Sequence, residues 1–477
     1  MSEREMNEKE TINTEMQFSE RHKMLSNRDE FINMAKDIRG MLSAHQLDAL
    51  RKYLHQFYPP DIADLMYFLN DNEFTEVFQQ LVIEEQAEVL DEVDDPTKTK
   101  ITQGMEPGKL AKILENLHSD EDADILEVME SNYASQVLSR LEKVKADHIR
   151  MLMAYPKESA GGIMSTGYIS VLETDTFSQA LDRFRQRTDA EPLFDMFVVD
   201  GQGNLLGKIS LRELLDNDPG SLVKDHLEPN VVSVPPEMDR EQVARIFARY
   251  DLSSLPVVTP LPEGKLLGLI TPDDIIDVIQ AENTEDFMRM TGSDAEEMEK
   301  RSPVRLALMR LPWIMATMFI ELMAGFAIRV FNPTLSRVLL LASFMPIISA
   351  ISGNTGLQSA TIIVRGLSAG KIEVAGWHRA VLRQLTMTLI LGSVTGITLG
   401  TIGAIWYGKL MFGIVVAVGM FSAVNIAGIV GTVVPLTSKK LGFDPAITSG
   451  PFETAFQDVV GISIFLGLAT LLIHYLL

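Results

Sequence analysis

The sequence predicts a multidomain protein with an all-α superhelical N domain, an α/β module of two repeats, and an all-α polytopic membrane domain with five transmembrane helices. Three observations support this prediction: short helical units in residues 31–155, a motif that occurs twice in residues 156–281, and long apolar stretches within residues 311–477. We expect residues 1–30 to form a flexible N-terminal tail and residues 282–310 to form a connecting helix.

Charge is divided unevenly along the chain. The 477 residues include 42 Lys+Arg and 65 Asp+Glu, a formal net charge of −23. Residues 311–477 contain 9 basic and 5 acidic residues, so the first 310 residues carry 33 basic and 60 acidic ones. This acidic half argues against nucleic acid as a partner, because phosphate binding needs a Lys/Arg surface, and it suits cations instead. The absence of cysteine excludes disulfides and thiolate metal sites.

Residues 31–155 contain short units that resemble one another, such as "PPDIADLMYFLN" and "EPGKLAKILENL". Within each unit, apolar residues recur at three- and four-residue spacing, and Pro, Asp or Ser stands where a helix would begin. The pattern predicts a stack of helical hairpins, which is a small solenoid. An irregular helical bundle fits it nearly as well.

The repeated motif pairs "FVVDGQGNLLGKISLRELL" (197–215) with "LPVVTPLPEGKLLGLITPDDIIDVI" (255–279). Each copy reads as strand, hairpin, strand and helix. This order resembles a tandem pair of CBS domains, over about 156–218 and 222–281, and such pairs form one pseudo-symmetric module that often dimerises. The resemblance also makes ATP a candidate ligand, because Asp273 or Asp274 in "DDIID" stands where CBS domains often place a ribose-binding carboxylate.

Five apolar stretches have the length of membrane spans. We expect Pro346 and "SGNTG" to interrupt the second. The N-terminus has no apolar signal segment, and Lys and Arg near the ends of the stretches place the N-terminal domains in the cytoplasm and the C-terminus outside the cell membrane. The stretches run over 311–331, 335–364, 380–407, 410–436 and 446–477.

Asp458 lies well inside the fifth stretch. An ionisable group at mid-bilayer costs about 2.5 to 3.5 kcal/mol on insertion scales and usually faces a bundle interior or a watery path. No Lys or Arg lies in the central part of the last three stretches, so a cation is the expected counter-ion. Neutral oxygens on Asn354, Asn425 and Gln457 add to a hard-oxygen site suited to Mg²⁺, which keeps several of its waters.

Two membrane motifs, "PIISAISGNTGLQSATIIVRGLSAG" and "VVPLTSKKLGFDPAITSGP" followed by an Asp, resemble the MgtE family of magnesium transporters. The resemblance covers nearly the whole chain. It implies a homodimer in the lipid bilayer, a Mg²⁺ channel with its pore on the dimer axis and Asp458 as the pore aspartate. By the same resemblance, Asn425 lies near Asp458, and Asp444 lies at the cytoplasmic mouth.

The family resemblance also implies that the pore closes when cytosolic Mg²⁺ bridges acidic residues between domains. Two carboxylates about 4 Å apart repel by roughly 4 kcal/mol at an effective dielectric constant of 20, so a bridging ion would bring such domains together. The matching positions are Glu76, Asp120 and Asp124 in the N domain, Asp239, Glu241 and Asp251 in the second CBS repeat, and Asp274, Glu282, Glu285 and Asp286 towards the connecting helix.

Glu321, Glu453 and Gln457 depart from the family pattern. The extra carboxylates could strengthen divalent binding, or Glu321 could pair with Arg329. Transport of Co²⁺ or Mn²⁺ is therefore an alternative to Mg²⁺. A second alternative is a membrane-anchored CBS nucleotide sensor, which would have no use for Asp458. An enzyme is not expected, because the sequence lacks a P-loop, a nucleophile elbow and metal-hydrolase spacing.

Overall fold

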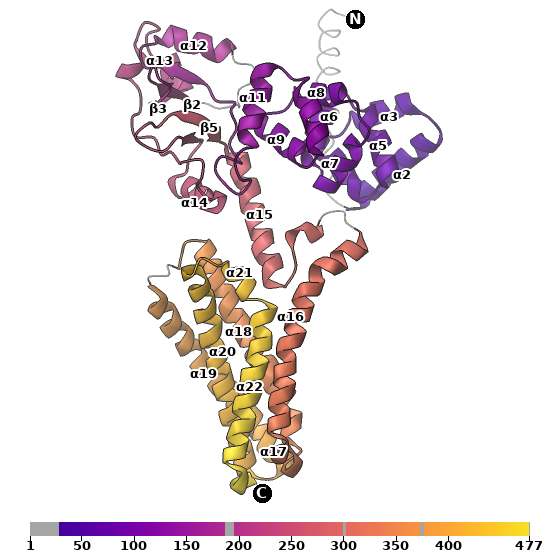
Figure 1. Ribbon diagram of the computed structural model, residues 1–477, viewed down its shortest axis with the longest axis vertical. Coiled ribbons are helices and arrows are strands. Elements are labelled where there is room, and N and C mark those ends of the chain that lie inside the picture. Colours follow the sequence, from indigo (N-terminus) through magenta and orange to yellow (C-terminus); the bar gives the residue numbers. More distant parts are fainter. Residues whose placement is uncertain (1–27, 187–194, 299–301, 373–375, 477) are drawn as a thin grey trace, which may run out of the picture. The chain divides into compact units, whose positions relative to one another are not determined.

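The computed structural model describes residues 28–186, 195–298, 302–372 and 376–476 (Figure 1). The predicted tail lies outside the described residues up to residue 27. The chain forms two compact units, Met1–Val278 and Ile279–Leu477.

Short helices follow one another through the N domain, and most of them pack on the second helix after them, as α4 does on α6 and α9 on α11. This succession confirms the predicted stack of hairpins. Local signals start the helices: Asn70 accepts hydrogen bonds from the backbone N–H of Glu73, and the Glu73 carboxylate accepts one from the backbone N–H of Asn70. The helices are α2 (Arg28–Ser43), α3 (Leu47–Leu54), α4 (Pro59–Ala63), α5 (Asp71–Gln80), α6 (Ile83–Glu92), α7 (Asp95–Thr102), α8 (Pro107–Leu114), α9 (Ser119–Glu127), α10 (Ser131–Leu138) and α11 (Lys143–Leu152).

The CBS pair contains the predicted strand, hairpin, strand and helix in both repeats. In the first repeat, β1 runs parallel to β2, which pairs antiparallel with β3. In the second, β4 pairs antiparallel with β5, and a parallel bridge from Val234 to Val257 takes the place of β1. The register shifts after Val198 in one hairpin and after Val257 in the other. The elements are β1 (Ser170–Leu172), α12 (Phe177–Gln186), β2 (Asp195–Val199), β3 (Leu205–Ser210), α13 (Leu211–Asp216), α14 (Arg240–Tyr250), β4 (Leu255–Val258) and β5 (Leu266–Ile270).

The N domain and the second CBS repeat share one hydrophobic core. Buried Leu126 and Ile149 of the N domain belong to the same cluster as Val243 and Ile275 of the repeat. The two parts are therefore packed against each other through buried apolar side chains.

The connecting segment is helical at both of its ends and is not one continuous helix. Helix α15 (Pro272–Met290) is followed by Gly292, whose φ of 74° favours glycine. A 3₁₀ turn follows at Ala295–Met298. Helix α16 then begins at Pro303, capped by Ser302, so the first span starts eight residues before the predicted boundary at 311. Arg305 and Arg310 fit this first part of the helix because arginine is a good helix former.

Five segments of the second unit have the length and composition of membrane spans. The predicted interruption of the second span is wrong: α18 continues through Pro346 and "SGNTG". Its hydroxyl groups donate to its own backbone, as Ser352 does to the carbonyl of Ile348 and Thr355 to that of Ile351. The elements are α16 (Pro303–Val330), α17 (Asn332–Arg337), α18 (Leu341–Ser368), α19 (Trp377–Tyr407), α20 (Leu410–Lys440), α21 (Pro445–Thr448), α22 (Pro451–Leu471) and α23 (Ile473–Leu476).

Glycines in α18 serve packing. A Cβ added at Gly431 of α20 would collide with the carbonyl oxygen of Gly356 in α18, and one added at Gly356 would collide with the carboxylate of Glu453 in α22. Three helices therefore approach closely at Gly356 because that position has no side chain.

Replacing Gly431 with alanine should force α18 and α20 apart. Overpacking of this kind costs about 1 to 3 kcal/mol of unfolding free energy, so we expect a lower Tm in detergent, read by intrinsic fluorescence. Gly325→Ala in α16 is the matched control, since a Cβ there meets no atom within 4 Å. Equal Tm values for both variants would contradict the close crossing.

Candidate functional site

Asp458 lies where three membrane helices meet. Ser349 of α18 donates a hydrogen bond to the Asp458 carboxylate of α22. The carboxyl group of Glu321, on α16, is also within hydrogen-bonding reach of Asp458. The structure thus brings together two acidic side chains that are far apart in sequence.

Two carboxyl groups in contact need a proton or a cation between them, because two bare carboxylates repel. In the part of the chain that the structure describes, neither Asp458 nor Glu321 forms an ion pair with Lys or Arg, and the alternative pair of Glu321 with Arg329 is not formed. Glu321 is exposed and Asp458 is partly exposed. The pair is therefore accessible to an ion from outside the chain.

Glu453 has a different environment from Asp458. Only 3% of its surface is exposed, and Gln457 Nε2 donates to Glu453 Oε1 over 3.0 Å. The carboxylate packs against Gly356, and its other oxygen, Oε2, is buried without a hydrogen-bond partner. Glu453 and Gln457 thus lie inside the helix packing.

The two candidate asparagines are also placed differently. Asn354 is exposed on α18. Asn425 lies in the interface of α19 and α20, where its Oδ1 accepts from Thr388 Oγ1 over 3.1 Å and its Nδ2 donates to the Phe421 carbonyl over 2.8 Å. The bond from Thr388 joins α19 to α20, the bond to Phe421 lies within α20, and both polar atoms of Asn425 are therefore engaged within the protein.

A second acidic group lies at the end of α15. Ser368 Oγ of α18 donates to Asp286 over 2.8 Å. The guanidinium of Arg289 contacts both Glu285, one turn earlier, and Asp444, which caps α21 through the Ala446 N–H. Burial raises the pKa of Asp286, and the charge of Asp444 adds to this effect. Three of the predicted acids, Glu285, Asp286 and Asp444, therefore lie around Arg289. Glu282 is half-buried one turn earlier in α15.

A third acidic group lies between the N domain and the second CBS repeat. Asp274 accepts hydrogen bonds from the N–H and the hydroxyl of Thr271, over 2.7 and 2.6 Å. Burial and the neighbouring charge of Asp120 raise its pKa to about 8. Burial also raises the pKa of Asp120, and its Oδ1 is buried without a hydrogen-bond partner. Burial raises the pKa of Asp124 to about 6.

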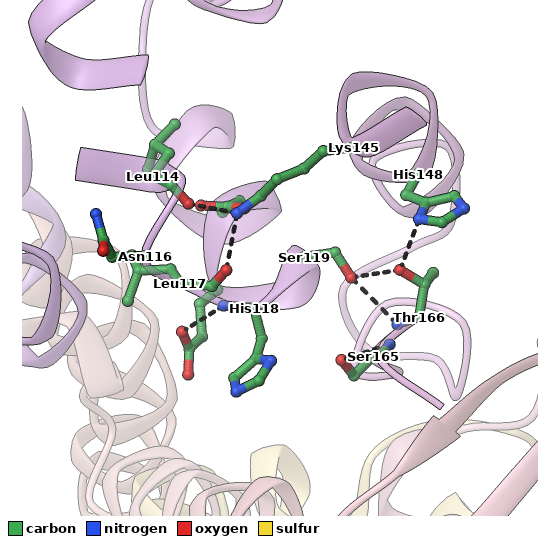
Figure 2. A network of polar contacts seen from close by, with 12 residues as sticks. Leu114, Asn116, Leu117, His118, Ser119, Lys145, His148, Ser165 and Thr166 are labelled. Carbon is green, nitrogen blue, oxygen red and sulfur yellow. Dashed lines mark hydrogen bonds and ion pairs between the residues drawn. The ribbon is translucent and has the colours of Figure 1, made fainter. Parts of the chain in front are cut away.

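A polar junction at the start of α9 joins the N domain to the CBS pair (Figure 2). Ser119 and His148 of the N domain both contact the Thr166 hydroxyl, over 2.8 and 3.1 Å, and the Thr166 N–H donates to Ser119 Oγ. Lys145 donates to the Leu117 carbonyl over 2.8 Å. The start of α9 is thus bound to the CBS pair directly beside Asp120.

The remaining predicted residues are spread over the surface. Glu76 is exposed on α5, and Asp273 is exposed at the start of α15. Asp239 caps α14, Glu241 pairs with Arg245 over 3.2 Å, and Asp251 ends α14 at a φ of 49°. Over the described ranges, the structure contains no set of three or more His, Asp or Glu side chains placed to hold one metal ion.

Sequence reasoning missed several neighbours of these sites. Ser349 stands in "PIISAIS", at the start of a motif that was singled out for its family resemblance and not for this hydroxyl group. Asp91 and Asp277 surround the Asp120 group, and burial raises the pKa of both. Their signal was the density of acids in "VLDEVDD" and "DDIID", which does not indicate which acids face each other.

Comparisons with known proteins support the family resemblance. A family model described as a divalent cation transporter, MgtE, matches residues 345–468. The MgtE intracellular N domain matches residues 57–158, and the CBS domain matches residues 160–220 and 223–281. The magnesium transporter MgtE of Enterococcus faecalis is 34% identical over 332 residues, which is 69% of this chain and 73% of the relative. The chain belongs to the MgtE family.

Other MgtE proteins give similar matches. The magnesium transporter MgtE of Thermus thermophilus is 35% identical over 331 residues, 68% of this chain and 72% of the relative. A crystal structure of the cytosolic domain of the Mg²⁺ channel MgtE in complex with ATP is 33% identical, with a TM-score of 0.48, over 51% of this chain and 99% of that chain.

The family models cover some residues of the three acidic groups and leave others outside. Asp458, Glu453 and Asp444 fall within the transporter model, and Asp120 falls within the N-domain model. Glu321 lies before the first residue of the transporter model. The contact between Glu321 and Asp458 therefore joins a matched segment to an unmatched one.

The Asp120 group should make the contact between the N domain and the CBS pair depend on pH. The pKa of Asp274 is about 8 in the folded chain and 3.8 in the reference state, so the neutral form stabilises the contact. This stabilisation is complete below about pH 4 and is lost as the pH rises towards 8. Above that pH the ionised Asp274 carboxylate is repelled by the charges of Asp120 and Asp273, which face it. Without divalent ions, hydrogen exchange in α9, corrected for its intrinsic pH dependence, should therefore increase over this range.

Asp274→Asn should flatten that increase, because the amide cannot ionise. Asp251→Asn, at the exposed end of α14, serves as the control and should leave it unchanged. The same pH dependence in all three proteins would show that Asp274 does not govern the contact.

Proposed function

We propose that this MgtE-family chain carries Mg²⁺ across the membrane along a path that passes Asp458. The observation that carries the proposal is the contact between Asp458 and Glu321 at the meeting of three helices, with Ser349 as the hydroxyl partner. Carboxylate and hydroxyl oxygens are ligands that Mg²⁺ prefers, and few protein oxygens suffice for an ion that keeps several waters. A hydrated ion is therefore the proposed cargo.

We further propose that cytosolic Mg²⁺ closes the path. The unpartnered Asp120 Oδ1 beside Asp274 suits a hard cation, because an ion could satisfy both oxygens and remove their repulsion. Ion binding that draws the two carboxylates together would favour one arrangement of the domains, which is an allosteric coupling. The group around Asp286 and Asp444 is the corresponding candidate at the membrane domain.

The proposed assembly is a homodimer with the N-terminal domains in the cytoplasm and the C-terminus outside. An odd number of spans, counted from an intracellular N domain, supports this orientation. The dimer is supported by the exposure of Glu321, which leaves room for a second copy at the ion path.

ATP is a proposed ligand of the CBS pair. A cavity of about 310 Å³ is lined by Thr166, Tyr168, Ser170 and Lys265, together with His148 and apolar neighbours. Hydroxyl groups and a lysine are suitable partners for a nucleotide. Asp273 and Asp274, the predicted ribose ligands, are not among the lining residues.

Asp458→Asn should reduce Mg²⁺ flux into proteoliposomes at least about tenfold, because the amide carries no charge to offset ion dehydration. A magnesium-sensitive dye inside the vesicles measures the flux. Glu453→Gln is the matched control: its side chain is buried in helix packing, and we expect a change of no more than about twofold.

Equal losses in the two variants would contradict the distinction between the path-lining and the packed carboxylate. Wild-type flux in Asp458→Asn would overturn the ion path. Adding Co²⁺ or Mn²⁺ in competition tests the alternative cargo, which would be favoured if either ion passed faster than Mg²⁺.

Asp120→Asn should weaken the inhibition of flux by Mg²⁺ on the cytosolic side. Loss of one carboxylate removes a ligand of the proposed regulatory ion, so half-inhibition should need roughly ten times more Mg²⁺. The measurement is Mg²⁺ flux at fixed external and varied cytosolic concentration. Glu76→Gln, a change at an exposed acid on α5, is the comparison. An unaltered threshold in Asp120→Asn would exclude the proposed role of this group.

A further inference from the structure

A basic cavity lies between α18 and α19, apart from the acidic groups. Its volume is about 420 Å³, within the range of small-ligand sites. Lys371, Arg379 and Arg383 line it. Among the residues that the structure describes, none of these three cations forms an ion pair, and no acidic residue lines the cavity.

The remaining wall of the cavity is largely apolar. Two of its lining residues are buried: Ile363 and Gln384, whose Nε2 donates to Ser359 of α18. Ile362 and Met387 also line the cavity and are 54% and 40% exposed. The cavity therefore combines a charged part with apolar side chains on the outer faces of two spans.

The charged part is held in a defined conformation. Gly370 has a φ of 64°, and the backbone N–H groups of Lys371 and Ile372 both donate to the Gly366 carbonyl over 2.9 Å. The Ile372 side chain packs against Gly366. Lys371 is thus fixed beside the end of α18, within the same cavity as Arg379.

The cavity lies at the end of α18 that contacts α15. Arg365 of α18 contacts Asn283, and Ser368 donates to Asp286. In the proposed topology this end faces the cytoplasm. Anionic lipids give the cytoplasmic leaflet a negative surface potential, which attracts such basic groups.

We propose that this cavity binds the headgroup phosphate of an anionic glycerophospholipid from the cytoplasmic leaflet. Lys371, Arg379 and Arg383 contact the phosphate, and the acyl chains lie along Ile362 and Met387. Three cations, with no acid among the described lining residues, favour an anionic lipid over a zwitterionic one, and the exposed apolar wall favours a lipid over a free anion. The proposal depends on the proposed membrane orientation but not on the identity of the transported ion.

Trp377 provides a built-in reporter. It is the first residue of α19, it is exposed, and it lies two positions before Arg379. The chain has three tryptophans, so Trp313→Phe with Trp406→Phe leaves Trp377 alone. In vesicles of phosphatidylcholine, acyl-brominated phosphatidylglycerol should quench Trp377 at a lower mole fraction than acyl-brominated phosphatidylcholine does.

Arg379→Gln with Arg383→Gln should remove this preference. Each basic group near an anionic surface contributes about fivefold, so the relative association constant of phosphatidylglycerol should fall towards one, by up to about thirtyfold. Lys439→Gln with Lys440→Gln is the matched control, because it removes two exposed charges at the end of α20, outside the cavity. Size-exclusion profiles verify that each variant is folded.

Several outcomes would overturn the proposal. An unchanged preference in the Arg379 and Arg383 variant excludes these residues as lipid ligands. Equal losses in both double variants would indicate general attraction to the surface. Relief of quenching by inorganic phosphate would indicate a site for a free anion. These variants keep Asp458, so Mg²⁺ flux measured on the same proteins separates failure of the lipid site from failure of the ion path.

Discussion

A carboxylate that leaves water must be neutralised, and much of this structure depends on how that requirement is met. At the end of α15 the chain supplies its own cation, Arg289, between Glu285 and Asp444. Asp120 and Asp274 instead face each other, and hydrogen bonds from Thr271 satisfy part of Asp274. In the membrane domain, Asp458 meets Glu321 and a serine hydroxyl. The two latter groups leave the neutralising charge to a proton or to a mobile ion.

The helices around Asp458 can hold polar groups because their own backbones satisfy many of them. Ser352 and Thr355 donate to carbonyls one turn earlier, so α18 carries a polar sequence without breaking. Glycines then let α18, α20 and α22 approach closely at Gly356. Close packing without bulky side chains gives the carboxylates fixed positions, and a fixed position is what distinguishes a binding group from a merely acidic surface.

The order of domains, the repeated hairpins and the five long apolar helices follow from local patterns, and the structure confirms them. The hydrophobic period and the turn residues are short-range signals that a sequence displays directly. The continuity of α18 does not follow from such signals, because Pro346 and the glycines are local helix breakers that tertiary packing overrides.

Which acidic side chains face each other could not be predicted from the sequence, for a related reason. Nothing in the chain near Glu321 indicates that α16 brings it to Asp458, and nothing near Glu453 indicates that Gly356 shields it. Asp458 could be singled out because it lies well inside an apolar stretch. The roles of its neighbours depend on which helix faces which, and that information is long-range.

Arg289 has a consequence for any divalent ion that reaches Glu285 and Asp444. Its guanidinium already occupies the space between Glu285 and Asp444. An ion could bind both acids only after the arginine had moved away, so binding there is an exchange of one cation for another. The apparent affinity for the ion then compares how strongly the two acids bind the ion with how strongly they bind the arginine. A single basic residue can therefore adjust the concentration to which an acidic pair responds.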